Sequence, residues 1–314
     1  MAVHVHTLGD STLDNLYWRL GETPSLPVAK STSVEGRLKS VLGRGFEVIS
    51  HAFDGFTTKS ILNGSDIGAV LPRDRVAFPA YITEKAPKQR FIKPLEELQK
   101  EVSKDSNAYH YVVLSVAGND FRENLLNPIR FIKDISSIQK RYLQIVEKIK
   151  NLKGRNIRPI LMLQYRTDAK NDLYRIYTVL KIIGVAALIM QIGCFALFTA
   201  PIWVTTPSIC GLVSAVGAVG LFLLNEKLLP LSALKNILTG KKISMLCLGT
   251  LLQSFYRPIL QQAKKDKIPI LDLPNTFNPY KDLYDHGIEP GKQGAELIAE
   301  GIAHIVKNHD YSTE

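Results

Sequence analysis

Residues 110–116 read HYVVLSV, and the four residues that follow them read AGND. An apolar run of this length with little alternation is typical of a strand buried on both faces, as in a parallel sheet. Similar runs that end in turn residues predict four more strands, at residues 3–8, 46–52, 157–164 and 268–273. The sequence therefore predicts a sheet of five strands.

Helical patterns separate the predicted strands along the chain. They lie at residues 33–42, 94–103, 128–153, 251–265 and 291–307. Strands that alternate with helices favour a parallel sheet with helices on both faces, so we predict the α/β class. The chain carries neither of the glycine-rich motifs that bind nucleotide phosphates, and its three cysteines lack a metal-binding spacing. We therefore expect no cofactor and no metal.

A run of 44 residues, 182–225, contains no Asp, Glu, Lys, Arg or His. One membrane span needs about 20 apolar residues, so the run predicts two helices, at about 176–200 and 209–225, joined by a turn. Lysines and arginines flank the run on both sides, and the positive-inside rule therefore places both flanks in the cytoplasm. A re-entrant hairpin and a pair of core helices in a soluble domain are the alternatives.

The uncharged run interrupts the α/β pattern between its fourth strand and the helix before its fifth. We therefore predict an inserted membrane segment at residues 167–245, within a discontinuous domain made of residues 1–166 and 246–314. Residues 228–242 are basic and apolar, and they either lie on the membrane surface or pack on the domain. The first residues lack the basic start and long apolar stretch of a signal peptide. The expected protein is a membrane protein with two spans, whose α/β domain faces the cytoplasm.

The net charge of +10 comes from 39 Lys and Arg against 29 Asp and Glu. A basic chain favours an anionic partner, which can be a nucleic acid or a membrane surface. Part of the positive charge flanks the uncharged run, and no nucleic-acid-binding motif is present. We therefore expect a membrane and no nucleic acid as partner.

Ligands of parallel α/β sheets bind at the carboxyl ends of the strands. Four segments follow predicted strands there: Gly9-Asp10-Ser11, residues 54–58 (DGFTT), residues 117–120 (AGND) and residues 282–290 (DLYDHGIEP). They would gather a serine, a glycine, an asparagine and a histidine at one edge of the sheet. Three other histidines, His4, His6 and His51, lie on predicted strands, where we expect them to be packed or exposed without a functional role.

Taken together, the four segments resemble the sequence blocks of the GDSL, or SGNH, hydrolase family. The resemblance implies a flavodoxin-like three-layer α/β/α fold with a five-stranded parallel sheet, and cleavage of carboxylic esters. It also implies that Ser11 is the nucleophile, and that the N–H groups of Ser11 and Gly55 and the amide of Asn119 form an oxyanion hole. Asp10 and Asp120 would support these residues. Ala117 stands where the family has a glycine.

The last block departs from the family pattern, Asp-x-x-His-Pro. When the two are aligned on Pro290, His286 takes the place of the Asp and Glu289 takes the place of the His. Three interpretations follow. His286 is the general base, oriented by Asp282, Asp285 or Glu289. Alternatively, Glu289 is itself the base, or the site has lost catalysis.

The function predicted first is a membrane-anchored serine hydrolase that cleaves acyl or lipid esters. A catalytically inactive membrane-bound binding or scaffold protein is the alternative from another class, and the altered last block favours it. An acyltransferase that uses the same serine site is the third possibility. The substrate partner would be an ester or lipid in or at the bilayer.

Overall fold

The computed structural model describes residues 2–23, 25–68, 71, 77–85, 90–124, 128–154, 156–165, 168, 248–278 and 280–311. The chain divides into two compact units. The first contains Met1–Asn124, Arg130–Arg166 and Phe255–Glu314, and the second contains Leu125–Ile129 and Thr167–Ser254. The sheet and every candidate site residue belong to the first unit.

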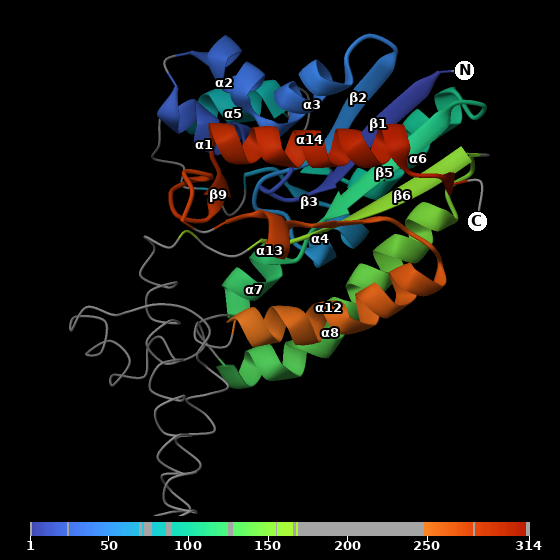
Figure 1. Ribbon diagram of the computed structural model, residues 1–314. Coiled ribbons are helices and arrows are strands. Elements are labelled where there is room, and N and C mark those ends of the chain that lie inside the picture. The colour runs from blue at the N-terminus through green and yellow to red at the C-terminus, as the bar shows by residue number, and fades with distance from the viewer. Residues whose placement is uncertain are drawn as a thin grey trace, which may run out of the picture. The chain divides into compact units, whose positions relative to one another are not determined.

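Five strands form one sheet at the centre of the first unit (Figure 1). They are β1 (Val3–Gly9), β2 (Phe46–Ala52), β5 (Tyr109–Ser115), β6 (Asn156–Leu163) and β7 (Ile270–Asp272). Their order is β2-β1-β5-β6-β7 and every neighbouring pair is parallel. Counted along the chain, this order is the 2-1-3-4-5 arrangement of flavodoxin-like folds. The five-stranded parallel sheet predicted from the sequence is confirmed.

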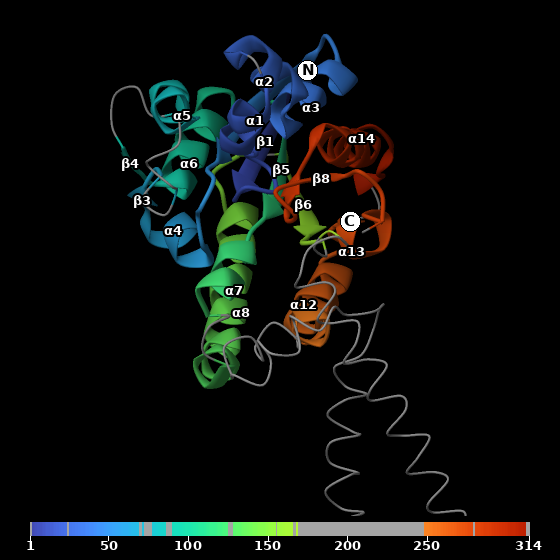
Figure 2. The same cartoon turned by 90° about the vertical axis from the view of Figure 1, so that its left-hand side faces the viewer.

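Helices cover both faces of this sheet, as Figures 1 and 2 show. One face carries α3 (Val34–Leu42) and α14 (Lys292–Asn308), which lie side by side and bury their apolar residues with those of the strands. The other face carries α6 (Pro94–Lys104), α8 (Pro128–Lys150) and α12 (Leu248–Lys265). These are the five helices that the sequence predicted, so the three-layer arrangement is confirmed.

Side chains of β5 explain why this strand reads as an unbroken apolar run. Tyr111 and Val113 belong to the core shared with α3 and α14, whereas Val112 and Leu114 alternate with them and are fully buried. Successive residues of a strand point to opposite faces. A strand at the middle of a sheet with helices on both sides therefore needs apolar residues at every position.

Short elements that were not predicted from the sequence fill the connections. The helices are α1 (Leu16–Glu22), α2 (Leu26–Thr32), α4 (Thr58–Asn63), α5 (Ala77–Lys85), α7 (Gly118–Asn124) and α13 (Leu273–Thr276). Two small antiparallel pairs join β3 (Ser65–Asp66) to β4 (Phe91–Ile92), and β8 (Tyr284–Asp285) to β9 (Glu289–Pro290). Each is too short to leave a clear periodic pattern.

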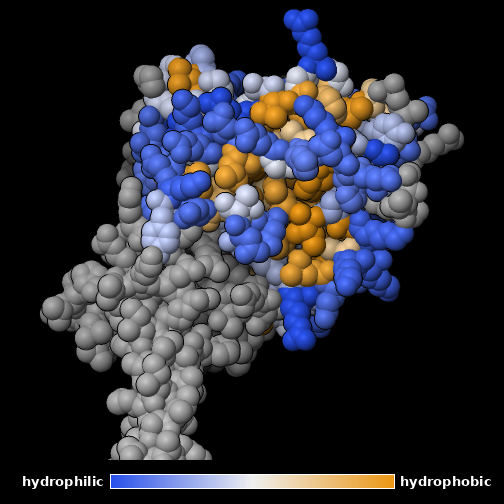
Figure 3. All heavy atoms as spheres, viewed as in Figure 1, coloured by the Kyte–Doolittle hydropathy of each residue, from blue (hydrophilic) through white to orange (hydrophobic). Residues whose placement is uncertain are grey.

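The predicted membrane segment, 167–245, lies outside the described residues apart from Asp168. The same holds for its two predicted helices, 176–200 and 209–225, and for residues 228–242. Among the helices that the structure does describe, none has the length and apolar character that crossing a bilayer requires. On the face seen in Figure 1, apolar residues reach the surface between α14 and α12 (Figure 3).

Four histidines meet on the α6 side of the sheet. His6 is fully buried, and its Nδ1 lies 3.3 Å from His51 Nε2 and its Nε2 lies 3.0 Å from His110 Nδ1. The ring of His4 stacks on that of His110 at 5.1 Å. Burial, followed by the charges of the neighbouring histidines, lowers the pKa of His6 to about 2, and burial lowers the pKa of His51 to about 4. In the described part of the chain, no three His, Cys, Asp or Glu residues are arranged to hold a metal ion.

Candidate active site

The loop that carries Ser11 begins at the end of β1, where Gly9 lies opposite Ser115 of the neighbouring strand β5. A Cβ atom on Gly9 would lie 1.9 Å from Ser115 O, so only glycine allows this approach. Asp10 N then donates to Ser115 O at 3.1 Å. The carbonyl of Asp10 accepts from Leu13 N at 3.0 Å and from Asp14 N at 2.9 Å, which closes a tight turn around Ser11. Ser11 keeps 9% of its surface exposed at the carboxyl edge of the sheet.

The side chains of Asp10 and Gln164 support this turn through hydrogen bonds. One oxygen of the Asp10 carboxylate accepts from Thr12 N at 3.1 Å, and Gln164 Nε2 donates to both oxygens at 3.2 Å. Gln164 Nε2 also donates to Ser115 Oγ at 3.1 Å, and its Oε1 accepts from Thr12 Oγ1 at 2.7 Å. Burial raises the pKa of Asp10 to about 6, although the hydrogen bonds from Thr12 and Gln164 oppose the rise.

Gln164 was not among the predicted site residues, although it lies at the centre of this hydrogen-bond group. One signal could have found it. It is a polar residue directly after the apolar strand β6, at the edge of the sheet where ligands bind.

The second loop follows β2 and contains Gly55. Phe53 N donates to Gly9 O at 3.1 Å, so this loop starts directly beside the Ser11 loop. Phe56 N donates to Phe53 O at 3.2 Å and closes a turn. Gly55 has a φ of +83°, a conformation that side-chain-bearing residues rarely adopt. Glycine is therefore required here by the turn itself.

The segment after β5, where α7 begins, holds the second loop in place. Asn119 Nδ2 donates to Phe56 O at 3.1 Å. Asp120 accepts from Thr58 N at 2.7 Å and from Thr58 Oγ1 at 2.6 Å, and Arg141 lies 3.2 Å from the same carboxylate. The two residues predicted from the AGND block thus both contact the loop of Gly55. Asp120 binds the loop through Thr58, while an amide has two N–H groups and Asn119 can offer the second to a ligand.

Ala117 precedes this contact in a backbone conformation with a φ of +111°. An alanine rarely adopts such a φ, because its Cβ atom clashes with the backbone, whereas a glycine does so freely. A glycine would fit this position without strain. Strained backbone of this kind is found where the surrounding structure fixes a functional loop.

Two backbone N–H groups at this edge stand out from their neighbours. The N–H groups of Asp10 and Thr12, on either side of Ser11, both donate to acceptors. Those on either side of Gly55, which belong to Asp54 and Phe56, do so as well. Among the residues that the structure describes, no acceptor takes the N–H of Ser11 or of Gly55.

The final segment, 284–290, is a hairpin whose tip lies against the end of α1. His286 has a φ of +52°, and its Nε2 lies 2.9 Å from Glu22 Oε1, the last residue of α1. Its ring lies 5.0 Å from that of Trp18. Asp285 pairs with Arg19 at 2.5 Å. The tip of the hairpin is therefore held by the last turn of α1.

The base of the same hairpin meets the opposite end of α1. Asn15, the N-cap residue of α1, donates to Pro290 O at 2.7 Å, and Tyr165 Oη donates to Ile288 O at 2.7 Å. A seven-residue helix is about 10 Å long, so His286 and Pro290 lie at opposite ends of it. Glu289 lies between the two anchored residues and only 4% of its surface is exposed.

The charges of the site link Glu289 to the Ser11 loop. Burial raises the pKa of Tyr165 well above its ordinary value, and the negative charges of Glu289 and Asp10 add to the rise. Tyr165 thus lies near both carboxylates.

Asp282 is exposed in the turn before β8. The structure therefore brings together the loops of Ser11, Gly55 and Asn119 with the segment of Glu289, and it pairs His286 with Glu22 and Asp285 with Arg19.

No protein-family model matches the sequence, and no curated protein matches it either. Several solved structures are similar to the chain over nearly its whole length. An aryl esterase from M. smegmatis is 14% identical with a TM-score of 0.45, and the match covers 98% of this chain and 99% of that one. A carbohydrate acetylesterase from Sinorhizobium meliloti is 12% identical with a TM-score of 0.44, over 97% of this chain and 98% of that one. A lipase/acylhydrolase from Enterococcus faecalis is 11% identical with a TM-score of 0.32, over 97% and 95%.

Proposed function

We propose that this domain hydrolyses carboxylic esters, with Ser11 as the nucleophile. The observation that carries the proposal is the pair of N–H groups at Ser11 and Gly55, which have no acceptor among the described residues while all their neighbours are engaged. Backbone N–H groups in such loops, together with the Asn119 amide, are suited to stabilise an oxyanion. The four sequence blocks that resemble GDSL hydrolases supply the same residues.

In the proposed reaction, Ser11 Oγ attacks the ester carbonyl and loses its proton to a base. The negative charge that develops on the carbonyl oxygen receives hydrogen bonds from Ser11 N, Gly55 N and Asn119 Nδ2. The base returns the proton to the departing alcohol, which leaves an acyl group on Ser11. Water then attacks the acyl group and gives its proton to the same base, which returns it to Ser11 Oγ as the acid and the free serine are released.

We assign the base to Glu289 rather than to His286. His286 pairs with Glu22 at the far end of α1, whereas Glu289 is buried between two anchored residues at the near end. A base must lie within hydrogen-bond reach of the proton that it takes. Residues 288–290, where the hairpin ends, contact the Ser11 side of α1, whereas the tip of the hairpin at His286 does not.

Membrane attachment is a second part of the proposal, and the sequence alone supports it. The uncharged run, 182–225, is long enough for two spans, and a tethered domain would act on acyl or lipid esters at the bilayer. Extraction of membranes with alkaline carbonate tests this attachment. Release of the full-length protein into the supernatant would contradict it without touching the serine mechanism.

Labelling with a fluorophosphonate probe and turnover of a p-nitrophenyl ester test the serine mechanism. We expect the wild type to label and to turn over, and Ser11→Ala to do neither. Ser31→Ala is the matched control, because Ser31 is exposed and bonds only locally to Val28 O, 3.0 Å away. Unchanged labelling of Ser11→Ala would refute the mechanism. A folded wild type that neither labels nor turns over would favour a binding protein.

Two further variants identify the base. Glu289→Gln keeps the size of the side chain and removes its charge, so kcat should fall by about 100-fold or more if the carboxylate is the base. His286→Gln should leave kcat within a few-fold of wild type. The opposite pattern, a large loss in His286→Gln alone, would return the role of the base to the histidine.

A further inference from the structure

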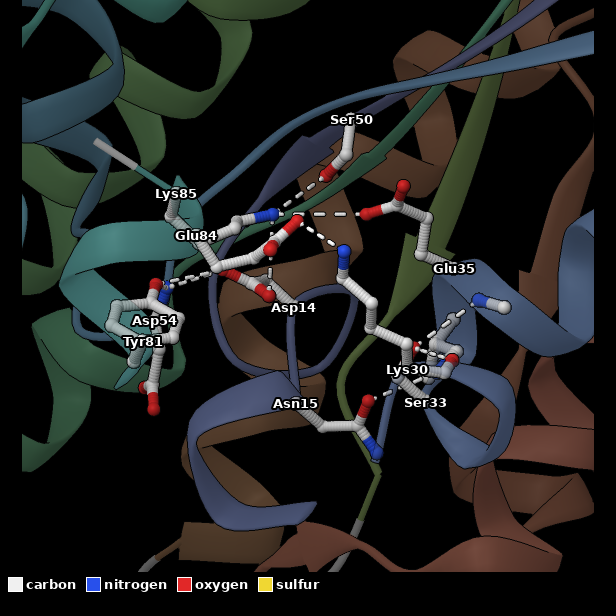
Figure 4. Close-up of polar contacts among 12 residues, drawn as sticks. Asp14, Asn15, Lys30, Ser33, Glu35, Ser50, Asp54, Tyr81, Glu84 and Lys85 are labelled. Atoms are coloured by element: carbon white, nitrogen blue, oxygen red, sulfur yellow. Dashed lines mark hydrogen bonds and ion pairs between the residues drawn. The ribbon is translucent and has the colours of Figure 1, made fainter. Parts of the chain in front are cut away.

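A buried lysine lies close to the loop of Gly55 without belonging to any of the four sequence blocks. Lys85 is the last residue of α5, and its side chain is 9% exposed. Its Nζ lies 3.4 Å from Asp14 Oδ1, 3.8 Å from Glu35 Oε2 and 3.4 Å from Ser50 Oγ (Figure 4). The ammonium group also lies 5.4 Å from the ring centre of Phe53.

Asp14 connects this lysine to both loops of the candidate site. Its second oxygen, Oδ2, accepts from Tyr81 Oη at 2.8 Å and from Asp54 N at 3.3 Å, and Asp54 N also donates to Tyr81 Oη at 3.0 Å. Asp54 is the residue before Gly55. Asp14 N in turn donates to Asp10 O, which closes the turn of Ser11. One buried residue therefore contacts both loops: its carboxylate accepts from the backbone of the oxyanion loop, and its own N–H closes the turn of the nucleophile loop.

Such a carboxylate needs a partner, because an ionised group without one is costly in the interior. Asp14 is almost fully buried and so is Tyr81. The charged groups around Lys85 are Asp14, Glu35 and Glu84. Burial alone would lower the pKa of Lys85, but these carboxylates outweigh it and the net pKa is raised, so the lysine is charged. Burial raises the pKa of Asp14, and Lys85 and Tyr81 oppose that rise.

We propose that Lys85 is a positioning residue of the ester-hydrolysing site, which neutralises Asp14 so that Asp14 and Tyr81 hold the N–H of Asp54 and thereby fix the turn that presents the Gly55 N–H. This inference rests on the proposed function. Lys85 touches neither substrate nor reacting atoms. It acts through Asp14 and the N–H of Asp54 on the direction of the next N–H group along the chain, that of Gly55.

Removal of the lysine charge should show itself in kcat and in the pH profile. In Lys85→Met, Asp14 loses its cation and takes up a proton at neutral pH, since burial favours the neutral acid. A protonated Asp14 is a poorer acceptor for the two donors that share its Oδ2. Loss of one oxyanion donor costs 100- to 1,000-fold in kcat, so a displaced donor should cost about 10- to 100-fold, with KM less affected. The activity should recover as rising pH ionises Asp14.

The test measures kcat and KM of the full-length protein with a p-nitrophenyl ester, from about pH 6 to pH 9, for the wild type and four variants. Lys85→Arg should retain most of the activity, because it keeps the charge. Tyr81→Phe removes only the hydroxyl group and should lower kcat by about tenfold. Lys30→Met is the matched control: Lys30 pairs with Glu84 at 2.6 Å in a more exposed place, and its removal should change nothing.

Retention of kcat within twofold in a folded Lys85→Met would overturn the inference, as would a loss that is equal at every pH. If Lys85→Met does not fold, Tyr81→Phe decides, and an unchanged kcat in that variant overturns the inference. A wild type without turnover or fluorophosphonate labelling overturns the proposed function itself. The two failures are therefore distinguishable.

Discussion

The buried histidines predict a steep loss of stability in mild acid. His110 Nε2 lies 2.8 Å from Asp105 O, and a carbonyl can only accept, so Nε2 of His110 carries the proton. In the neutral chain, His110 Nδ1 must then accept from His6 Nε2, and His6 Nδ1 must accept from His51 Nε2. These hydrogen bonds thus form when all three rings are neutral. A proton added to His6 Nδ1 would turn this acceptor into a donor and break its hydrogen bond with His51 Nε2.

The direction of the effect follows from the pKa values. The pKa of His6 falls from 6.5 to about 2 on folding and that of His51 falls from 6.5 to about 4, so the unfolded chain binds protons more readily. Their contribution is complete above pH 6.5 and is lost as pH falls, down to about 4 for His51 and further for His6. At about pH 4.5 each histidine has lowered the free energy of unfolding by roughly 2.5 kcal/mol, at 1.36 kcal/mol per pH unit.

Asp10 acts in the opposite direction. Its pKa is raised from 3.8 to about 6, so the folded state binds a proton as pH falls through 6. By about pH 4.5 this raises the free energy of unfolding by roughly 2 kcal/mol. The wild type should therefore lose about 3 kcal/mol of unfolding free energy between pH 7 and pH 4.5 from these three groups. That is a large part of the ~5–15 kcal/mol that stabilises a typical domain.

The variant His6→Gln isolates the histidine contribution. Its amide can still donate to His110 but does not titrate, so the loss between pH 7 and about pH 4.5 should be smaller than in wild type by about 2.5 kcal/mol. Urea unfolding of the full-length protein, followed by circular dichroism at both pH values, measures this difference. His304→Gln, at an exposed position on α14, is the control and should lose as much as wild type. A loss in His6→Gln within about 0.5 kcal/mol of wild type would refute the reasoning.

Three substitutions probe the loops of the site. Gln164→Leu removes the donors to Asp10 and Ser115 and should cost about 2–4 kcal/mol in urea unfolding, since it leaves buried groups without partners; a cost below ~1 kcal/mol would contradict the hydrogen bonds described. Gly9→Ala places a Cβ atom 1.9 Å from Ser115 O and should prevent soluble expression, so a normal yield and melting temperature would show that the strands can separate at small cost. Asp120→Asn should destabilise the domain by about 1–3 kcal/mol and lower kcat, and it fails as a prediction if neither thermal unfolding nor turnover changes.

The sheet and its main helices could be predicted because their patterns are local. The apolar run of residues 110–116 shows by itself that the strand is covered on both sides. The positions of Gly55 and Asn119 just beyond strands could also be predicted, because each lies within four residues of a strand's end, whereas their roles stay predictions. The predicted bounds of the five strands lie within two residues of those observed.

The supporting residues could not be predicted, because their roles depend on contacts between distant parts of the chain. Gln164 meets Asp10 across 154 positions, and Tyr81 meets Asp14 across 67. Nothing in the neighbouring sequence of Lys85 indicates that it is buried. The last block was ambiguous for a similar reason, since a spacing of three residues does not reveal that a hairpin separates His286 from Glu289. The membrane hairpin stays a prediction from the uncharged run.

The hairpin of residues 284–290 gives α1 the role of a spacer of fixed length. One end of the helix is joined to Pro290 through Asn15, and the other is joined to Asp285 and His286 through Arg19 and Glu22. An insertion of one turn, about 5.4 Å, would pull these anchors out of register with the hairpin. The number of residues in α1 therefore sets where Glu289 stands, although no residue of the helix needs to touch it.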